Sequence, residues 1–464
     1  MYGTRAWWAV SAALVIVALL VVPGPAAAAF RVGPNVQVYN DPRWQAEVAI
    51  AVNPADDRNF VAMSNNMLPG AENCVFKFSS KECPTWPALY TSTDGGRSWR
   101  TQLFPGYPGG PPGPLSDYDV GADPFVAFDR QGSAYAGGLF FRTETLARPL
   151  IDVAIAVSRS DDGGMTWNDP TFVIQSQGGG HNDFPHIAVD TTGGVHDGNV
   201  YVSWTDASGN FGSYGPQFVP KVATSRDRGS TWSAVPIPRP PHAGVPQASY
   251  YADYPAVGPN GEVYVTSDVI FLSNGATHDE IWLTVSYDGG ATFSELRIVE
   301  PDIPNFMQLG LAVDTSGGPY RGRIYVTWYD ARNGNLDILL KTSDDGGRTW
   351  SPNRRVNDDA GTATQYNVAV SVAPNGRVDL SFYDRRDDPN DLLNARYYAG
   401  STDGGVSFVN LRVSDASWDP AGIPLDDYDH IASTARTAQL VWADGRNNSP
   451  GGINMDIYTA TVFA

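Results

Sequence analysis

The sequence has few of the residues that support metal, thiol or nucleotide chemistry. It contains only two cysteines and six histidines among 464 residues. The histidines show no His-x-x-x-His spacing of the kind that binds zinc. No Gly-x-Ser-x-Gly segment and no glycine-rich phosphate loop is present. The sequence therefore does not indicate a zinc enzyme, a serine hydrolase or a nucleotide-dependent enzyme.

Positive charge is also scarce. The chain has 31 Lys and Arg residues against 50 Asp and Glu residues, which gives a formal net charge of −19 at pH 7. A negative field of this size repels nucleic acids and anionic lipids, so we expect neither as a partner. Only 17% of the residues are charged, whereas glycine (48 residues) and proline (35) are plentiful. This composition is typical of many short strands joined by tight turns.

Apart from residues 6–22, the sequence lacks an apolar run long enough to span a bilayer. That run follows the single charge of Arg5 and precedes a Pro-Gly-Pro segment and an alanine cluster that ends at Ala29. These features predict that residues 1–29 form a secretory signal peptide, cleaved after Ala29, and that the protein is secreted. An uncleaved membrane anchor is the alternative. We expect residues 30–464 to form one domain that has no membrane contact and is monomeric.

The two cysteines, Cys74 and Cys83, lie nine positions apart in a polar segment. In an oxidising compartment such a pair predicts one local disulfide. A two-ligand metal site is the weaker alternative, because no histidine lies near the pair.

One eight-residue pattern, Ser-x-Asp-x-Gly-x-Ser/Thr-Trp/Phe, recurs along the chain. Its Asp residues are separated by 57 to 68 positions. A fixed motif at nearly constant spacing indicates stacked copies of one supersecondary unit. The six copies, called the repeat turns below, are residues 92–99, 160–167, 225–232, 286–293, 343–350 and 401–408.

Comparison of the six copies indicates a structural turn. Arg228 replaces the residue after Asp in one copy, but the next position is glycine in every copy. We expect that glycine to have a positive φ or no room for a side chain, and expect it alone to be obligatory. The Asp carboxylate can accept backbone N–H groups across the turn. A catalytic role for the six Asp residues is the disfavoured alternative.

Each repeat turn lies within a larger pattern of apolar segments. Residues 48–52 and 60–63 precede the first copy, and residues 338–342 and 354–356 flank the fifth. Four antiparallel strands per repeat, arranged radially, predict a blade of an all-β β-propeller.

The repeat turn resembles the Asp-box (BNR) repeat of the sialidase (neuraminidase) superfamily, and the resemblance covers essentially the whole chain after residue 29. It implies a propeller in which the repeat turn joins the third and fourth strands of a blade. It also implies a sialidase-type exo-glycosidase that acts on extracellular or cell-surface glycans. Asp boxes occur in non-catalytic propellers too, so a glycan- or protein-binding propeller is the alternative.

The number of blades follows from the strand pattern. There are six repeat turns, but the pair of first and second strands occurs seven times, the last at residues 431–433 and 438–442. A third strand at residues 456–462 ends this last repeat, and residues 35–39 form a strand that belongs to no repeat. An open ring leaves unpaired edges. We therefore predict seven four-stranded blades closed by residues 30–41, and the alternative is a six-bladed sialidase-type propeller.

Polar residues stand just before the predicted first strands, at the end of each blade opposite the repeat turns. Such an acidic ring can supply a general acid, bind calcium or simply be solvated; calcium is the one cofactor that we consider possible. Three tyrosines lie beside the acidic residues, Tyr254, Tyr366 and Tyr428. The polar residues are Glu47, Asp123, Asp183, Asp253, Gln308, Asn367, Asp427 and Asp429.

An aromatic-x-Asp-x-Arg unit recurs between the second and third strands and ends in Arg332, Arg386 and Arg446. The family resemblance implies that these three arginines clamp a substrate carboxylate. It further implies Asp123 or Asp183 as the acid, a nucleophile among Tyr254, Tyr366 and Tyr428, and Glu47 as the carboxylate that makes the tyrosine more basic. The family's first clamp arginine is not assigned, because residues 30–34 depart from its motif.

A structural role is the alternative for the three arginines. Each unit is followed by a strand that opens with an Asp: Asp337, Asp391 or Asp456. In this interpretation each arginine pairs with the Asp across its own hairpin and braces the loop.

Overall fold

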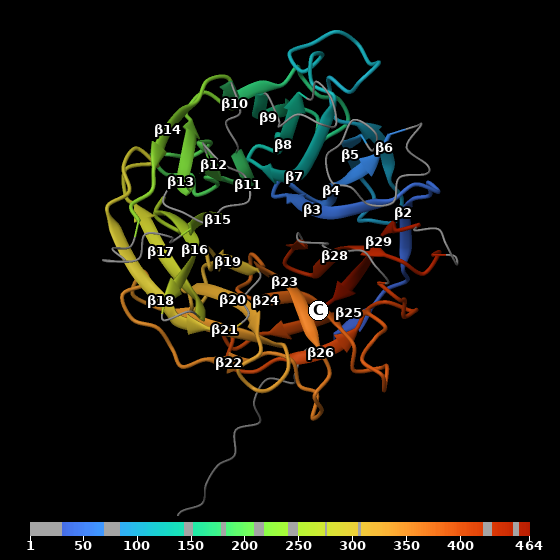
Figure 1. The fold of residues 1–464 in the computed structure, drawn as a ribbon, viewed down its shortest axis with the longest axis vertical. Helices are drawn as coiled ribbons and strands as arrows, with labels where there is room; N and C mark the ends of the chain where they lie inside the picture. The colour runs from blue at the N-terminus through green and yellow to red at the C-terminus, as the bar shows by residue number, and fades with distance from the viewer. Residues whose placement is uncertain are drawn as a thin grey trace, which may run out of the picture.

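The computed structural model describes residues 30–68, 84–142, 152–177, 182–207, 218–239, 249–273, 276–304, 308–420, 429–448 and 454–464. These residues form seven antiparallel sheets arranged as blades around one axis, and they contain no helix (Figure 1). The predicted seven-bladed, all-β propeller is confirmed. Cys74 and Cys83 lie outside the described residues, and so does the predicted signal peptide.

Six blades follow one another along the chain, and each has its first strand nearest the axis (Figure 1). Blade 1 contains β3 (Gln45–Asn53), β4 (Asp56–Met67), β5 (Thr85–Ser92) and β6 (Arg100–Leu103). Blade 2 contains β7 (Val120–Phe128), β8 (Ala134–Arg142), β9 (Asp152–Ser160) and β10 (Thr171–Gln177). Blade 3 contains β11 (Asn182–Val189), β12 (Val200–Ala207), β13 (Phe218–Ser225) and β14 (Ser233–Pro236).

The next three blades repeat this order. Blade 4 contains β15 (Ser249–Val257), β16 (Val263–Ser273), β17 (Ala276–Ser286) and β18 (Glu295–Ile303). Blade 5 contains β19 (Leu309–Val313), β20 (Ile324–Asp330), β21 (Asp337–Ser343) and β22 (Arg354–Arg355). Blade 6 contains β23 (Gln365–Val372), β24 (Val378–Asp384), β25 (Ala395–Ser401) and β26 (Val409–Arg412).

Blade 7 is built from both ends of the chain. Its inner strands are β27 (Ile431–Ser433), β28 (Thr437–Asp444) and β29 (Asp456–Phe463). Two short N-terminal strands, β1 (Arg31–Val32) and β2 (Val36–Tyr39), pair with β29 on its outer side. The predicted closure by the N-terminal segment is therefore confirmed, although two strands rather than one perform it.

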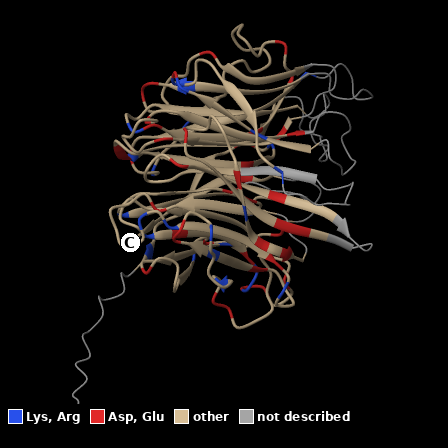
Figure 2. Cartoon of the chain, turned by 90° about the vertical axis from the view of Figure 1, so that its left-hand side faces the viewer, with Lys and Arg blue, Asp and Glu red and all other residues tan. Residues whose placement is uncertain are grey.

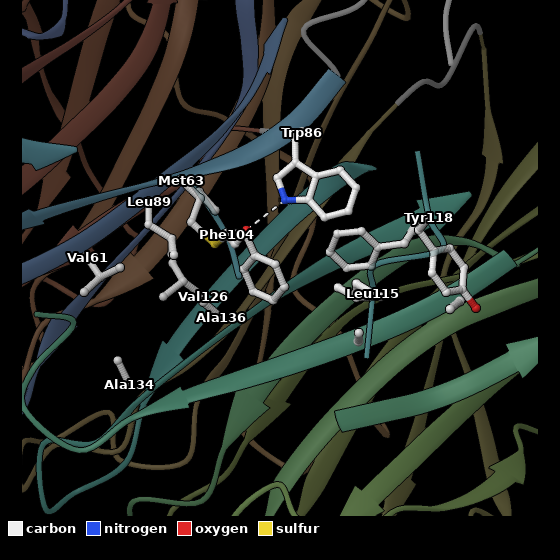
Figure 3. Packing of buried hydrophobic residues seen from close by; sticks show 14 of the residues in the cluster. Val61, Met63, Trp86, Leu89, Phe104, Leu115, Tyr118, Val126, Ala134 and Ala136 are labelled. Carbon is white, nitrogen blue, oxygen red and sulfur yellow. Dashed lines mark hydrogen bonds between the residues drawn. The ribbon is translucent and has the colours of Figure 1, made fainter. Parts of the chain in front are cut away.

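Large aromatic side chains fill the space between neighbouring sheets. Trp204, Trp328 and Trp442, on the second strands of blades 3, 5 and 7, are fully buried. Between blades 1 and 2, Trp86 packs against Phe104 and donates from Nε1 to the Phe104 carbonyl at 2.9 Å (Figure 3). Burial of this kind contributes about 25 cal/mol for each Å² of apolar surface removed from water, so the faces between blades are the core of the protein.

Charged side chains lie mainly outside this core. In the side view of the ring, Lys and Arg are scattered singly among more numerous Asp and Glu residues (Figure 2). Within the described part of the chain, no helix meets the length and hydropathy needed to cross a membrane.

The repeat turns are held by their own Ser and Asp side chains. In the fifth turn, Asp345 Oδ1 accepts the backbone N–H groups of Arg348 and Thr349, both at 2.9 Å. The Thr349 hydroxyl donates to Asp345 Oδ2 at 2.6 Å, and Gly347 N donates to the Ser343 hydroxyl at 2.8 Å. Hydrogen bonds from Thr349 lower the pKa of Asp345 to about 2. The carboxylate is thus occupied with the turn, as the structural interpretation predicts.

The recurrent glycine has a positive φ in every copy, and in every copy except Gly229 it also leaves little room for a side chain. Gly164 has φ +95°, and a Cβ there would lie 2.4 Å from a methyl carbon of Val61 in the preceding blade. The position before this glycine also has a positive φ, since Arg228 has a φ of 60°. Because an arginine occupies that position, glycine is not obligatory there, in agreement with the prediction. Arg228 is held in that conformation by blade 2, where Asp161 pairs with its guanidinium at 3.1 Å.

Five of the six turns also dock on the blade before them through their carbonyl groups. Thr91 of blade 1 donates to the Gly164 carbonyl at 2.7 Å, and Asn59 donates to the Gly163 carbonyl at 2.9 Å. Arg323 of blade 5 donates to the Gly404 carbonyl of blade 6 at 2.9 Å. The repeat turn therefore joins neighbouring blades as well as the two strands of its own blade.

Two glycine substitutions separate the effect of backbone strain from the effect of the contact between blades. Gly95 has φ +80° and no atom within 4 Å of an added Cβ, whereas Gly164 combines a left-handed φ with the contact to Val61. We expect Gly95→Ala to cost about 1 kcal/mol from backbone strain alone. Gly164→Ala should cost a further 1–3 kcal/mol or so, because blade 1 has to move. Thermal unfolding of both variants measures the difference, and equal losses would contradict the docking role.

Candidate functional site

The end of the ring opposite the repeat turns is called the mouth. The first strand of each blade starts there, since Gln45 at the start of β3 pairs with Asn66 at the end of β4. The repeat turn lies at the other end, where Ser92 pairs with Phe60. Of the residues predicted to precede the first strands at this end, only Gln308 and Asp429 do so among the described residues. The others lie within the first strands, in the part nearer the mouth: Glu47, Asp123, Asp183, Asp253 and Asn367. Asp427 lies outside the described residues.

A β-bulge interrupts the first strand near the mouth in five blades. The register with the second strand shifts between Ala46 and Ala49, Ala122 and Phe125, Asp183 and His186, Ala252 and Pro255, and Tyr366 and Ala369. A bulge bends the strand and changes the direction of the side chains within it. Because five blades have this bulge at the same position in the first strand, the bulge is a shared feature of the mouth.

Four residues within these bulges have left-handed backbone conformations. Glu47, Asp123, Phe184 and Asn367 have φ values between 53° and 55°. Such values are uncommon for residues other than glycine and cost free energy that the surrounding structure has to supply. Two of the four are carboxylates predicted to be catalytic.

The predicted carboxylates differ in exposure. Glu47 is only 4% exposed and accepts a hydrogen bond from the Asn65 side-chain amide. Asp123 and Asp183 are partly exposed, and Asp183 Oδ1 accepts the backbone N–H of Phe184 at 3.1 Å. Asp429 is buried and forms an ion pair with Arg396, Oδ2 to Nη1 at 2.6 Å, in which neither side chain is exposed. The mouth therefore combines buried and solvent-facing acidic groups.

Tyr254, one of the predicted nucleophiles, lies in a cluster of aromatic rings. Its ring centroid is 4.0 Å from that of His186 and 5.7 Å from that of His430, and the two histidine rings are 6.4 Å apart. The three residues belong to blades 4, 3 and 7, so they meet across the axis. Burial lowers the pKa of His430 to about 4 and that of His186 well below its usual value.

Sequence reasoning did not find the two histidines. It searched for metal-binding spacings, whereas His186 and His430 come together only when blades 3 and 7 face each other. Their positions next to the predicted acidic ring were the available signal, three residues after Asp183 and one after Asp429.

Tyr366, a second predicted nucleophile, is held on the blade 6 side of the mouth. Its hydroxyl accepts a hydrogen bond from Asn394 Nδ2 at 2.5 Å, and its ring lies 5.4 Å from that of Tyr383. The Arg385 guanidinium lies over the same ring, 5.3 Å from the centroid. Tyr428, the third candidate, lies outside the described residues.

The three predicted clamp arginines each bind the Asp two residues earlier in their own unit. Arg332 Nη2 lies 2.7 Å from Asp330, Arg386 Nη2 lies 2.8 Å from Asp384, and Arg446 Nη2 lies 2.7 Å from Asp444. All three Asp side chains are fully buried.

The three Asp residues that were predicted to pair with these arginines bind other residues instead. Asp337 pairs with Arg355 at 2.7 Å, Asp391 accepts from Thr364 and Asp456 accepts from Asn447. The arginines therefore brace their loops through another Asp than the one predicted, because two residues along a loop bring the carboxylate closer than the far side of the hairpin.

Each of the three arginines also reaches the preceding blade. Arg332 pairs with Glu300 of β18 at 3.1 Å, Arg386 pairs with Asp358 after β22, and Arg446 pairs with Asp415 after β26. The three guanidinium groups thus occupy three successive interfaces between blades. Although burial works against the charge, hydrogen bonds with Asp384 and Asp358 raise the pKa of Arg386 on balance. A role in binding a substrate carboxylate stays a prediction, and it would require each arginine to exchange an existing ion pair.

One arginine that sequence reasoning missed is arranged differently. Arg385 donates to the Asn394 side-chain oxygen at 3.0 Å and to the Asp391 carbonyl at 3.1 Å, and it is partly exposed. It makes no ion pair within the described part of the chain. Its charge is therefore balanced by neutral oxygens and the face of Tyr366.

The described side chains contain no group of three or more His, Cys, Asp or Glu residues arranged to hold a metal ion. The described residues therefore provide no defined set of ligands for the calcium ion that was considered possible at the mouth.

No family model matches the chain. Among solved structures, a protein of unknown function from Dyadobacter fermentans is similar over 94% of this chain and 99% of its own, with 14% identity and a TM-score of 0.51. An α-L-arabinanase from Penicillium chrysogenum, complexed with arabinobiose, is similar over 76% of this chain and 94% of its own, with 15% identity and a TM-score of 0.50. These two similarities establish likeness of fold alone.

An intramolecular trans-sialidase from Ruminococcus gnavus aligns over 80% of this chain and 94% of its own, with 14% identity and a TM-score of 0.49. The similar structures thus include sialidases and related propeller glycosidases at low identity.

Substitution of Arg386 by Lys tests its role between blades 5 and 6. A lysine cannot reproduce the two-nitrogen contact with buried Asp384 and reach Asp358 as well. We expect Arg386→Lys to lower the stability by about 1–3 kcal/mol, with unchanged glycan binding. Arg97→Lys, at an exposed repeat turn, is the control. A normal melting temperature combined with tenfold weaker binding of an acidic glycan would instead support the clamp.

The histidine cluster predicts a specific dependence of stability on pH. Because both histidines have lowered pKa values in the folded protein, the unfolded chain binds their protons first as the pH falls below 6.5. The two neutral histidines therefore make their full contribution to the free energy of unfolding above pH 6.5. The free energy of unfolding then falls towards pH 4, by at most about 1.4 kcal/mol per pH unit for each histidine. Between pH 6.5 and 5, His430→Gln should flatten the decline, whereas His196→Gln should not. Parallel profiles for His430→Gln and the wild type would contradict this assignment.

Proposed function

We propose that the protein is a secreted, glycan-active propeller, and specifically an exo-acting glycoside hydrolase whose site is the mouth. The observation that carries the proposal is the concentration of left-handed residues, two of them the carboxylates Glu47 and Asp123, in bulges at one end of the ring. Backbone strain of this kind collects at functional sites, where it positions side chains. Glycoside hydrolysis commonly requires a pair of carboxylates on opposite sides of the bond that breaks.

The aromatic residues beside the carboxylates support the same proposal. Tyr254, His430 and Tyr366 are partly exposed among the acidic groups, and rings of this kind present an apolar face next to a polar edge. Asp123 and Asp183 have the exposure to act on a bound glycan, and we assign the general acid to Asp123.

The chemical nature of the sugar is a narrower part of the proposal. A sialidase-type activity needs cations for the sugar carboxylate, and Arg332, Arg386 and Arg446 are already paired with buried Asp residues. Arg385 is the arginine near Tyr366 whose charge is balanced by neutral oxygens, so it is the better candidate if the sugar is acidic. The named similar structures include both an arabinanase and a trans-sialidase, so either a neutral or an acidic sugar agrees with them.

A panel of fluorogenic glycosides tests the proposal directly. It should include an α-L-arabinofuranoside and a sialoside, so that neutral and acidic sugars are both represented. We expect the wild-type protein to hydrolyse one member, and Asp123→Asn to lower kcat at least about a hundredfold, the usual contribution of a general acid. Asp57→Asn, an exposed residue on the opposite side of the ring, should leave the rate unchanged. Binding without hydrolysis would identify the non-catalytic alternative.

A further inference from the structure

Blade 1 differs from blades 3 and 6 where its second strand reaches the mouth. The residue that lies opposite the bulge is a buried tryptophan in blade 3, Trp204, and a buried phenylalanine in blade 6, Phe382. In blade 1 the corresponding residue is Ser64, and Asn65 and Asn66 follow it. All three are at most 5% exposed. Blade 4 has a similar buried polar run, residues 266–268, at the same place in its second strand. Such runs in otherwise apolar strands are a departure of the kind expected at functional sites.

Two of these three residues satisfy each other inside the blade. The Ser64 hydroxyl donates to Asn66 Oδ1 at 2.6 Å, and the Tyr90 hydroxyl lies 2.8 Å from that of Ser64 and 3.0 Å from Asn66 Oδ1. These contacts satisfy the two hydroxyl groups and the Asn66 side-chain oxygen inside the blade.

Asn65 is different, because its side-chain nitrogen has a hydrogen-bond partner and its side-chain oxygen has none. Its Nδ2 donates to Glu47 Oε2, whereas its Oδ1 is buried and has no hydrogen-bond partner. A buried acceptor without a donor costs about 1–3 kcal/mol. An ionised Glu47 cannot supply the donor, because a carboxylate only accepts hydrogen bonds. A hydroxyl group of a molecule bound at the mouth would supply the missing donor.

We propose that Glu47 and Asn65 form a subsite for hydroxyl groups, in which Asn65 Oδ1 accepts a hydrogen bond from a glycan hydroxyl next to one bound by Glu47. This proposal rests on the proposed function and names the part of the substrate that the site engages. The subsite offers acceptors and a negative charge, so it favours a neutral, hydroxyl-rich sugar unit and disfavours a carboxylate. It lies on blade 1, which separates it from Arg385 on blade 6.

Titration calorimetry with the neutral disaccharides arabinobiose, lactose and cellobiose tests the subsite. We expect the wild-type protein to bind at least one of them, and Asn65→Ala to weaken that binding about tenfold, the loss of one hydrogen bond worth 1.4 kcal/mol. Asn410→Ala is the matched control. Asn410 also has a buried Oδ1 without a partner, but it lies on outer strand β26, where it donates to the Val356 carbonyl at 3.0 Å. Its removal should leave binding unchanged.

Glu47→Gln provides a readout that does not depend on a ligand. A glutamine at position 47 can accept from Asn65 Nδ2 and donate to Asn65 Oδ1, so it satisfies the orphaned acceptor. We expect its melting temperature to rise by about 1–2 °C, while disaccharide binding falls about tenfold or more.

The outcomes separate this proposal from the one on which it rests. A wild-type protein that binds no disaccharide and hydrolyses no glycoside overturns the proposed function and the subsite together. A wild-type protein that processes only the sialoside, or an Asn65→Ala variant with unchanged affinity, overturns the subsite alone. A melting temperature that does not rise in Glu47→Gln also overturns it, because Asn65 Oδ1 would then not lack a donor.

Discussion

The pairing of the N-terminal strands with β29 is the interaction on which the ring depends. Six blades complete their own sheets, but blade 7 has only three strands until β1 and β2 join it. The outer side of β29 would otherwise expose a full row of backbone donors and acceptors. Asn35, between the two strands, extends the closure to blade 6, because its side chain donates to the Val413 carbonyl at 2.9 Å and accepts from Asp415 N at 2.9 Å. The position of every mouth residue relative to the others follows from this closure.

Much of the fold could be predicted because it is periodic. The repeat turns carry their own hydrogen-bonding side chains, so their conformation is local and each copy indicates the same structure. The surplus strand at residues 35–39 indicated the closure, since a ring has no place for an unpaired strand. The second left-handed position of the turn was missed because glycine occupies it in five of the six copies, and the contact that holds Arg228 comes from another blade.

The candidate site could be predicted only in part, because its chemistry depends on contacts between blades. The sequence indicated which carboxylates stand at the mouth, but not that Glu47 and Asp123 have left-handed backbones, since a bulge depends on register with another strand. The meeting of His186, Tyr254 and His430 requires the whole ring. The partners of Arg332, Arg386 and Arg446 were also misassigned. Each binds the Asp two residues earlier in its own unit and a carboxylate of the preceding blade.

The antiparallel pairing of Arg31 with Phe463 brings the two ends of the folded domain side by side on one strand edge, at the end of blade 7 that faces away from the mouth. The chain could therefore begin at another blade without changing the arrangement of the blades in space. A circular permutant that joins these ends by a short linker, and opens instead at a repeat turn, would retain every interface between blades. The same geometry makes either terminus a suitable attachment point, because a surface or a fusion partner linked there would leave the mouth turned towards solvent.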